Sequence, residues 1–430
     1  MPKSTPEILR HYRLIHDAYN GSNGFTDGGY LFQYEREINF GKRKKMASYT
    51  NFLGPIVDAK VKPVFSSPPV RSYNNNELMD LLIENADNNG TPLTDIIEEA
   101  TLAANLYKNA FIVMDMFEDV PSTLEDVIYD RRIPYVYVKT PMDVYEYESD
   151  DFGKLTSITF FHGENTYKKF DTTTTTVFTK DDSTDATNII AQADHGINEV
   201  PVVYLDTEVL PFPNHYGMAT LSRKIYNVDS EINDLSRSQM FNILVIPGIN
   251  SGDEESDGII VSTDNALFVD PEARNLPGFI GPDSSIMDSQ LSYFRELVKT
   301  LIQSADVLGS SAIATGNTGE SGIALTYRFY GKQQALKISS KIAAKFDTEV
   351  MRIFNLMCGE EPVEYSVAYE NNFAPTIEEI KEKITVLKEV MSLELGEEVE
   401  KELKSQIILL VGKLIGLNSD RIVELVSSNS

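Results

Sequence analysis

Two segments of this 430-residue chain share one apolar spacing and bracket a segment of a different kind. From Gly217, and again from Ser284, apolar residues recur at steps of three and four, which places them on one narrow face of a helix. The first stripe is Met218, Leu221, Ile225, Val228, Ile232 and Leu235, and the second is Met287, Leu291, Phe294, Val298, Leu301, Ala305 and Leu308. We expect two helices that pair antiparallel and project the intervening residues like a cap on a stalk.

The intervening residues, 247–283, differ from the helices on either side. Pro247 and Gly248 end the first helix, because proline cannot continue the backbone hydrogen bonding. The runs GIIV and ALFV are strand-like, and the tip SGDEESDG is acidic. The carboxylates of this tip are Asp253, Glu254, Glu255 and Asp257. A solvated acidic loop or a partner-docking surface is favoured over a catalytic pair, which would have to flank a cleft.

The other segments predict a chain of the α+β class. Residues up to about Asp119 read as interrupted helices followed by a strand-like run, FIVMDMF. Residues 133–206 alternate with a period of two, which predicts an antiparallel β-subdomain. Small residues from Gly309 to Gly322 predict a flexible loop, and a long helix follows until Gly359 terminates it. A strand-like segment then leads to a helical module that begins at Thr376, after Pro375.

Composition limits the possible functions. The net charge is −27, from 38 basic and 65 acidic residues, which is the wrong sign for a protein that grips phosphates by neutralisation. The acidity permits a protein that nucleic acid passes without sticking, and it equally serves solubility. We expect no membrane span and no secretory signal. The single cysteine, Cys358, excludes an internal disulfide and a thiolate zinc cluster.

Few motifs carry chemistry. The glycine-rich GNTGESG lacks the lysine of a phosphate-binding loop. None of the five histidines lies in a metal or nucleophile motif; they are His11, His16, His162, His195 and His215. We therefore expect no enzyme activity, no metal and no cofactor. The only basic run is Lys42, Arg43, Lys44 and Lys45; it reads as a solvated helix start or as a contact with packaged DNA.

The order of these parts resembles the portal proteins of tailed bacteriophages. The stretch GMATLSRKIYNVDSEINDLSRSQM is similar to a portal stem helix, and Ser321, Gly322, Ala324 and Leu325 are similar to the start of the long portal helix. The resemblance implies a portal-type fold. It would consist of a wing (1–213), a first stem helix (214–246), a clip (247–283), a second stem helix (284–308), a tunnel loop (309–322), a long helix with the wing return (323–375) and a helical crown (376–430).

The resemblance implies a head-tail connector ring, usually of twelve subunits, at one capsid vertex of the virion, assembled in the bacterial host cytoplasm. The ring would be the channel for packaging and ejection of double-stranded DNA. The clip would dock the terminase large subunit and later the head-completion proteins, and the ring would also contact the major capsid protein or scaffold.

The resemblance also implies which residues face the DNA. The tunnel loop would come nearest to it, with Ser310, Ser311, Thr315, Asn317, Thr318, Glu320 and Ser321. Arg295 and Lys299 flank the second stripe four residues apart, so they would point into the lumen or form a salt bridge between subunits. Two other readings stay open: a different virion ring or adaptor protein, and a soluble enzyme with an acidic cleft.

Overall fold

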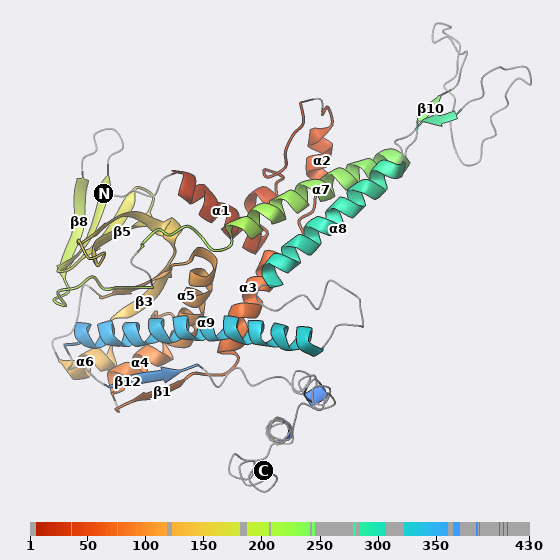
Figure 1. Cartoon of the computed structure of the whole chain (residues 1–430). Helices are drawn as coiled ribbons and strands as arrows, with labels where there is room; N and C mark the ends of the chain where they lie inside the picture. Colours follow the sequence, from red (N-terminus) through yellow and green to blue (C-terminus); the bar gives the residue numbers. More distant parts are fainter. Residues whose placement is uncertain are drawn as a thin grey trace, which may run out of the picture. The chain divides into compact units, whose positions relative to one another are not determined.

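The computed structural model describes residues 6–35, 37–74, 76–117, 123–180, 187–205, 208–240, 243–245, 278–280, 284–306, 322–359 and 364–369, with a few single residues beyond. The chain forms two compact units from segments that alternate along the sequence. Unit 1 comprises residues 1–20, 51–220 and 301–430, and unit 2 comprises residues 21–50 and 221–300. The described elements are helices together with antiparallel sheets (Figure 1), which confirms the α+β class.

Unit 1 carries most of the described elements. Its helices are α1 (Pro6–Asn20), α3 (Leu53–Val61), the 3-10 turn η2 (Lys62–Phe65), α4 (Glu77–Glu84), α5 (Leu93–Tyr107), α6 (Leu124–Tyr129), the 3-10 turn η3 (Pro141–Asp143) and α9 (Gly322–Met357). Its strands are β1 (Val70–Tyr73), β2 (Phe111–Asp115), β3 (Tyr135–Lys139), β4 (Val144–Ser149), β5 (Leu155–Gly163), β6 (Thr166–Asp171), β7 (Thr174–Lys180), β8 (Thr187–Asp194), β9 (Val202–Tyr204) and β12 (Tyr365–Ala368).

The predicted antiparallel β-subdomain is confirmed, but its strands divide between two sheets. Strands β4 to β8 form a five-stranded antiparallel meander in chain order. Strand β2 lies between β3 and β9 in a separate three-stranded sheet. All five residues of β2 are buried, as expected for a central strand that is covered on both faces.

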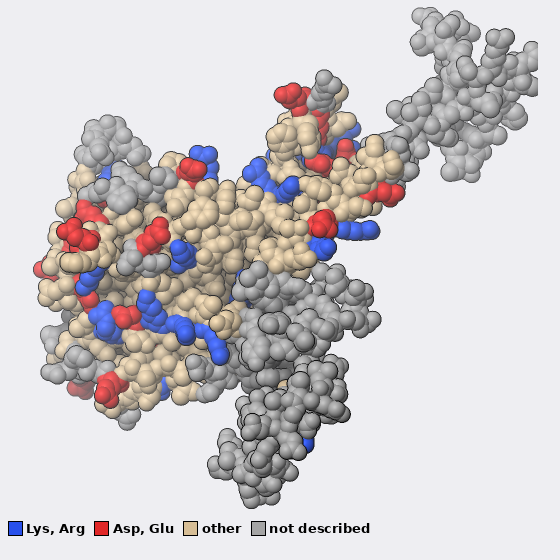
Figure 2. Space-filling model, in the orientation of Figure 1, with Lys and Arg blue, Asp and Glu red and all other residues tan. Residues whose placement is uncertain are grey.

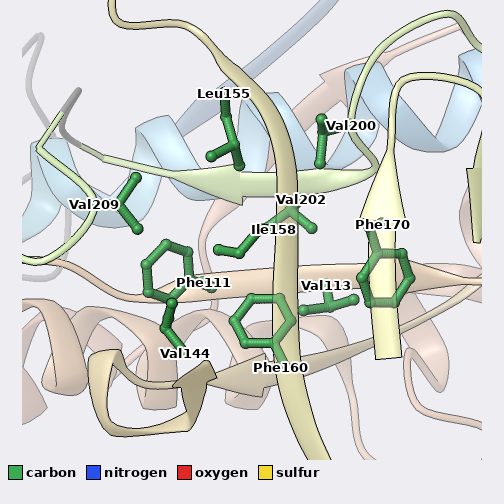
Figure 3. Packing of buried hydrophobic residues seen from close by; sticks show 10 residues of the cluster. All are labelled: Phe111, Val113, Val144, Leu155, Ile158, Phe160, Phe170, Val200, Val202 and Val209. Atoms are coloured by element: carbon green, nitrogen blue, oxygen red, sulfur yellow. The ribbon is translucent and has the colours of Figure 1, made fainter. Parts of the chain in front are cut away.

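The main β-core lies between these two sheets. Figure 3 shows Phe111 and Val113 of β2 facing Ile158 and Phe160 of β5, with Phe170 of β6 beside them. The Phe111 and Phe160 rings meet edge to face, with their centroids 5.6 Å apart. Full burial of each aromatic or branched side chain contributes about 1.5 to 3 kcal/mol. This cluster therefore holds the three-stranded sheet against the first strands of the meander.

Helix α9 is the 36-residue helix that the sequence predicts, and Gly359 with φ +70° follows it as the predicted terminator. Its apolar residues, which recur mostly at steps of four, do not all lie on the buried face. Phe346, Val350 and Ile353 are buried, but Ile338 is 52% exposed. A spacing of four advances about 40° more than a full helical turn at each step. Two such steps from Phe346 therefore carry Ile338 away from the buried face.

A buried ion pair joins α9 to the two-stranded sheet of β1 and β12. The Asp347 side chain is fully buried, and its Oδ2 lies 2.8 Å from Arg71 Nη2. The hydroxyls of Tyr365 and Tyr369 both donate to the Asp347 carboxylate. Burial first, and the carboxylate second, raise the pKa of Tyr369 far above its ordinary value. This phenol therefore stays protonated and remains a donor at any physiological pH.

Another buried charge in unit 1 leads to a stability prediction. Lys60 on α3 is 8% exposed, and burial lowers its pKa from 10.5 to about 8. Between these values the unfolded chain binds a proton that the folded chain does not, so stability rises with pH across that window. Below pH 8 the full cost of burying the charge remains.

We therefore expect Lys60→Met to raise the free energy of unfolding at pH 7 by about 1 to 3 kcal/mol. The gain should shrink above pH 8. Urea unfolding at pH 7 and pH 10 checks it, with the exposed neighbour Lys62→Met as the control. An equal effect at both pH values would show that Lys60 does not carry a depressed pKa.

Unit 2 is built around two long helices and the short strands at their ends. Helix α7 spans Tyr216–Met240, and its residues from Leu221 onward belong to this unit. Strand β10 (Ile243–Val245) pairs antiparallel with β11 (Gly278–Ile280), and α8 (Ser284–Asp306) follows. We call α7, β10, β11 and α8 together the stalk. It bears out the antiparallel stalk that the two stripes predict.

The first stalk helix is shorter than predicted. The predicted helix extends to residue 246, whereas α7 ends at Met240 and β10 follows. Ile243 and Val245 are β-branched, and they pair with Ile280 and Gly278 of β11. Branched side chains lose rotamer freedom in a helix and fit a pleated strand. Strand pairing therefore replaces the last helical turns.

Residues 21–50, which we call the arm, also belong to unit 2. The arm contains the 3-10 turn η1 (Asn23–Phe25) and the short helix α2 (Phe40–Met46). The wing that the resemblance predicts, residues 1–213, places the arm together with the β-subdomain. In the structure the arm instead packs on α7, as its contacts below show.

Candidate assembly interface

Helix α7 has an apolar face and a polar face, and the polar face contacts the arm. One is the predicted stripe, in which Ile225, Val228 and Ile232 are buried. The other is polar, and it contacts the arm through residues at helical steps of three and four. These are Arg223, Tyr226, Asn227, Ser230, Glu231 and Arg237. At about 100° per residue the two sets lie on opposite sides of the helix.

Arg43 is the main anchor of the arm. Its guanidinium forms a two-pronged ion pair with Glu37, at 2.6 Å from Nε and 2.8 Å from Nη2. Nη1 donates to Ser230 Oγ of α7 at 2.8 Å, and Nη2 donates to the carbonyl oxygen of Phe32 at 2.5 Å. The Arg43 side chain is 3% exposed. Its hydrogen bonds to Glu37 lower the pKa of that carboxyl, so the pair stays charged near neutral pH.

Other contacts fix the ends of the arm on α7. The backbone N–H of Phe32 donates to Asn227 Oδ1 at 2.7 Å, and the Tyr34 hydroxyl donates to Glu231 at 2.7 Å. Phe25 and Tyr49 approach the Tyr226 ring from the two ends of the arm, with centroids at 5.4 and 6.0 Å. Both ends and the middle of the arm are therefore tied to one helix face.

This anchoring presents apolar side chains to solvent. Phe32 is 61% exposed, Tyr34 50%, Ile38 95% and Met46 51%. We call these four residues the arm cluster. Single exposed apolar residues are ordinary on a protein surface, but several on one short segment are typical of an interaction site. The arm cluster is therefore the candidate contact surface of unit 2.

Helix α8 presents a polar face. Arg295 is exposed, and Lys299 Nζ lies 3.7 Å from Glu296 on the same helix. Tyr293, on the flank that faces α7, is 43% exposed, and Lys224 of α7 lies 5.4 Å from its ring centroid. This contact, the β10–β11 pair and Figure 1 place α8 along α7. The α8 side chains on the outer face remain open to solvent or to another subunit.

The predicted site residues have different outcomes. Arg43 is wrong as a DNA contact, because its guanidinium is buried in the anchor. Lys42 and Lys45 are exposed and Lys44 is half-buried, so a DNA contact stays a prediction for these three. Arg295 and Lys299 lie on the exposed face of α8, which accommodates either predicted role. The tunnel-loop residues of 310–321 and the acidic clip residues of 253–257 lie outside the described residues.

The described part of the stalk does not share the strong acidity of the chain. Among the residues of unit 2 that the structure describes, basic and acidic side chains are nearly balanced, and Figure 2 shows them interspersed over the visible face. On the described residues of α8 the charges alternate in sign, from Asp288 through Arg295 and Glu296 to Lys299.

The arm was not predicted as a candidate contact surface. A signal was present in Ile38, an apolar residue within the largely polar arm sequence YEREIN. The basic run concealed it, because four adjacent cations read as one solvated surface. Arg43 is buried because it contacts Ser230, which lies 187 positions away in the sequence. The sequence around Arg43 does not distinguish it from the more exposed lysines beside it.

The comparisons with known proteins do not establish a family. No model of a known protein family matches the chain, and no curated protein matches it. Among solved structures, it is similar to a chain from the neck of an empty GTA particle, computed with C6 symmetry. That match covers 97% of this chain and 95% of the other, at 10% identity and a TM-score of 0.41. A likeness at this level establishes neither a shared fold nor a shared function.

Among the helices that the structure describes, none is both long and apolar enough to cross a membrane.

Proposed function

We propose that the chain is the subunit of a phage portal ring. The observation that carries the proposal is the stalk. Two helices of 25 and 23 residues are joined through the β10–β11 pair. Helix α9 and an α+β unit supply further parts that the sequence resemblance implies, in the same order. Under this proposal α7 and α8 form the stem. The clip (247–283), the tunnel loop (309–322) and the crown (376–430) stay predictions, because nearly all of their residues lie outside the described ones.

Unit 2 has two different free surfaces, through which identical subunits could assemble into a ring by repeating the same contact. Helix α7 is covered on two opposite faces, whereas the outer face of α8 is open. The arm cluster exposes apolar side chains on another surface of the same unit. In a closed ring of one kind of subunit, neighbours meet through two different surfaces. We assign the arm cluster of one subunit and the α8 outer face of the next to these roles.

The charges of the stalk suit a channel through which DNA slides. A lumen of strong positive charge would bind phosphates and release their counterions, which slows translocation. The nearly balanced charges of the described stalk residues offer a duplex little net attraction. The chemistry of ATP hydrolysis would then belong to the terminase motor. Contacts with capsid and head-completion proteins, and a location in the virion, belong to the same proposal.

Mass measurement of the full chain in solution tests the proposal. We expect one species whose mass is an integer multiple, about twelvefold, of the 48.2 kDa subunit. A stable monomer that hydrolyses a member of a substrate panel would overturn the proposal in favour of a soluble enzyme.

The arm cluster leads to a sharper prediction. Ile38 is 95% exposed, so Ile38→Asp should change the stability of the subunit by no more than about 0.5 kcal/mol. Assembly should nevertheless fall by about tenfold or more, because the substitution removes an apolar side chain from the contact and leaves a carboxylate to be desolvated there. Sedimentation measures the fraction of assembled subunit. The matched control is Phe152→Asp, which alters a residue that is 92% exposed in unit 1. Equal effects of the two substitutions would exclude the arm cluster as the contact.

A further inference from the structure

Strand β8 is a long open edge of the five-stranded sheet. Among the described residues only β7 pairs with it, and Figure 1 shows it as the outermost strand of the meander. Every residue of β8 except Ala191 is exposed, including Ile189 and Ile190. Residues 187–193, TNIIAQA, carry no charge and no proline. Natural edges are commonly protected by lysine, proline or a bulge that turns the edge away. Strand β8 has one irregularity of register, between Ile189 and Ala191, and residues 191–194 pair regularly with β7.

The hydrogen-bond register identifies which backbone groups face the open edge. The N–H of His195 donates to the carbonyl oxygen of Thr173, and in an antiparallel pair every second residue bonds to the partner strand. Ala193 and Ala191 therefore bond to β7. The N–H and C=O groups of Gln192 and Asp194 point outward.

A pocket of about 470 Å³ lies beside this edge. The core-facing surface of the meander continues past the core to β7 and β8, where Val177 and Ala193 line the pocket. Phe117 and Met357 line other parts of its wall. Asp115 and Lys168 form an ion pair in the wall, so each charge is already neutralised. Asp194 and His195 also line the pocket, so its wall is polar along the strand edge. It is apolar at Val177, Phe117 and Met357, where an apolar side chain of the segment would fit.

We propose that β8 accepts an extended segment of a partner protein as a sixth strand. The outward groups of Gln192 and Asp194 would supply main-chain hydrogen bonds. Every second side chain of the segment would lie on the Ala193 face, and one of them would enter the pocket. In this binding mode main-chain bonds supply affinity and pockets for alternate side chains supply specificity. The segment would be apolar at these alternate positions and uncharged opposite residues 187–193.

The choice of a different protein over a second copy of this chain rests on the proposed ring. Antiparallel pairing of β8 with another β8 is a two-fold contact, in which the same surface serves both molecules. A cyclic ring has no such axis between neighbouring subunits. A partner strand, by contrast, can add to every subunit of a ring without changing its symmetry.

The test uses the full chain and an acetylated, amidated peptide, Lys-Thr-Val-Thr-Val-Thr-Val-Lys. We expect it to bind and to slow hydrogen exchange at the Gln192 and Asp194 amides by about tenfold or more at saturation. Gln192→Pro removes one outward N–H and leaves the bonds to β7 intact, so it should weaken binding by about tenfold or more. Gln192→Ala, the matched control, should bind as the parent does. The same peptide with alternate N-methylated residues should not bind.

Three results would overturn the proposal. The first is unchanged exchange at both amides, and the second is equal affinity of the parent and Gln192→Pro. The third is a dimer of the chain that Gln192→Pro abolishes, which would assign the edge to a second copy. The circular dichroism spectrum of Gln192→Pro must match that of the parent, which shows that the variant folds. If it does not match, Ile190→Lys is used in its place to block the edge. If neither the parent nor the variant formed rings, the proposed ring would be wrong. The edge-strand proposal would still be tested, because peptide binding is measured separately.

Discussion

Replacing Asp347 with alanine is expected to lower the free energy of unfolding of unit 1 by about 3 to 5 kcal/mol, because it leaves a buried cation without its partner. The Arg71 side chain is 9% exposed, and after the substitution its remaining described partner is the Thr94 hydroxyl at 3.1 Å. Two tyrosine hydroxyls also lose their acceptor. Since the chain has no tryptophan, urea unfolding followed by circular dichroism is the suitable measurement.

Two further variants separate the charge from the hydrogen bonds. Tyr369→Phe removes one donor and should cost about 1 kcal/mol. The double variant Asp347→Leu with Arg71→Met removes both charges, and it should recover a large part of the loss, because an apolar pair has no desolvation cost. If the double variant were as unstable as Asp347→Ala, packing and not charge would account for the effect.

Arg43→Ala is expected to release the arm from α7 and to abolish assembly. The substitution removes hydrogen bonds to Glu37, to Ser230 and to the backbone of Phe32, and it leaves Glu37 partly buried without its cation. We expect the free energy needed to open the arm away from α7 to fall by about 2 to 4 kcal/mol. Hydrogen exchange over residues 31–46 should then accelerate by about thirtyfold or more. Ring mass should be lost in the same variant.

Two substitutions control this prediction. Arg43→Lys keeps the charge but not the planar fork, so it should fail to restore the arm fully. Lys42→Ala removes the exposed neighbouring cation and should leave both exchange and assembly unchanged. Protection of the arm amides in Arg43→Ala would contradict the anchor. Loss of assembly in Lys42→Ala would point to the basic run itself as the contact.

Local patterns predict local elements of this chain well. The steps of three and four predict α7 and α8, and Gly359 terminates α9 as its position indicates. The alternation over residues 133–206 predicts strands, because each must place every second side chain in the core. These features depend on neighbours within a few residues, and a single sequence contains that information.

Contacts between distant residues were beyond the same reasoning. The end of α7 depends on β11, which begins 33 positions after β10 ends. From the sequence, Arg43 is expected to be as exposed as Lys42, because its burial depends on the distant Ser230. The Asp347 pair joins residues 276 positions apart, and nothing near Asp347 marks it as buried. The clip and tunnel-loop residues stay predictions.

The closed ring is the central claim, and electron microscopy of the purified full chain tests it most directly. The predicted result is end-on views of a ring with rotational symmetry and a central hole. Particles with the dimensions of a single subunit, two-fold dimers or open filaments would contradict the account. Filaments would show that the subunits repeat one contact without closing.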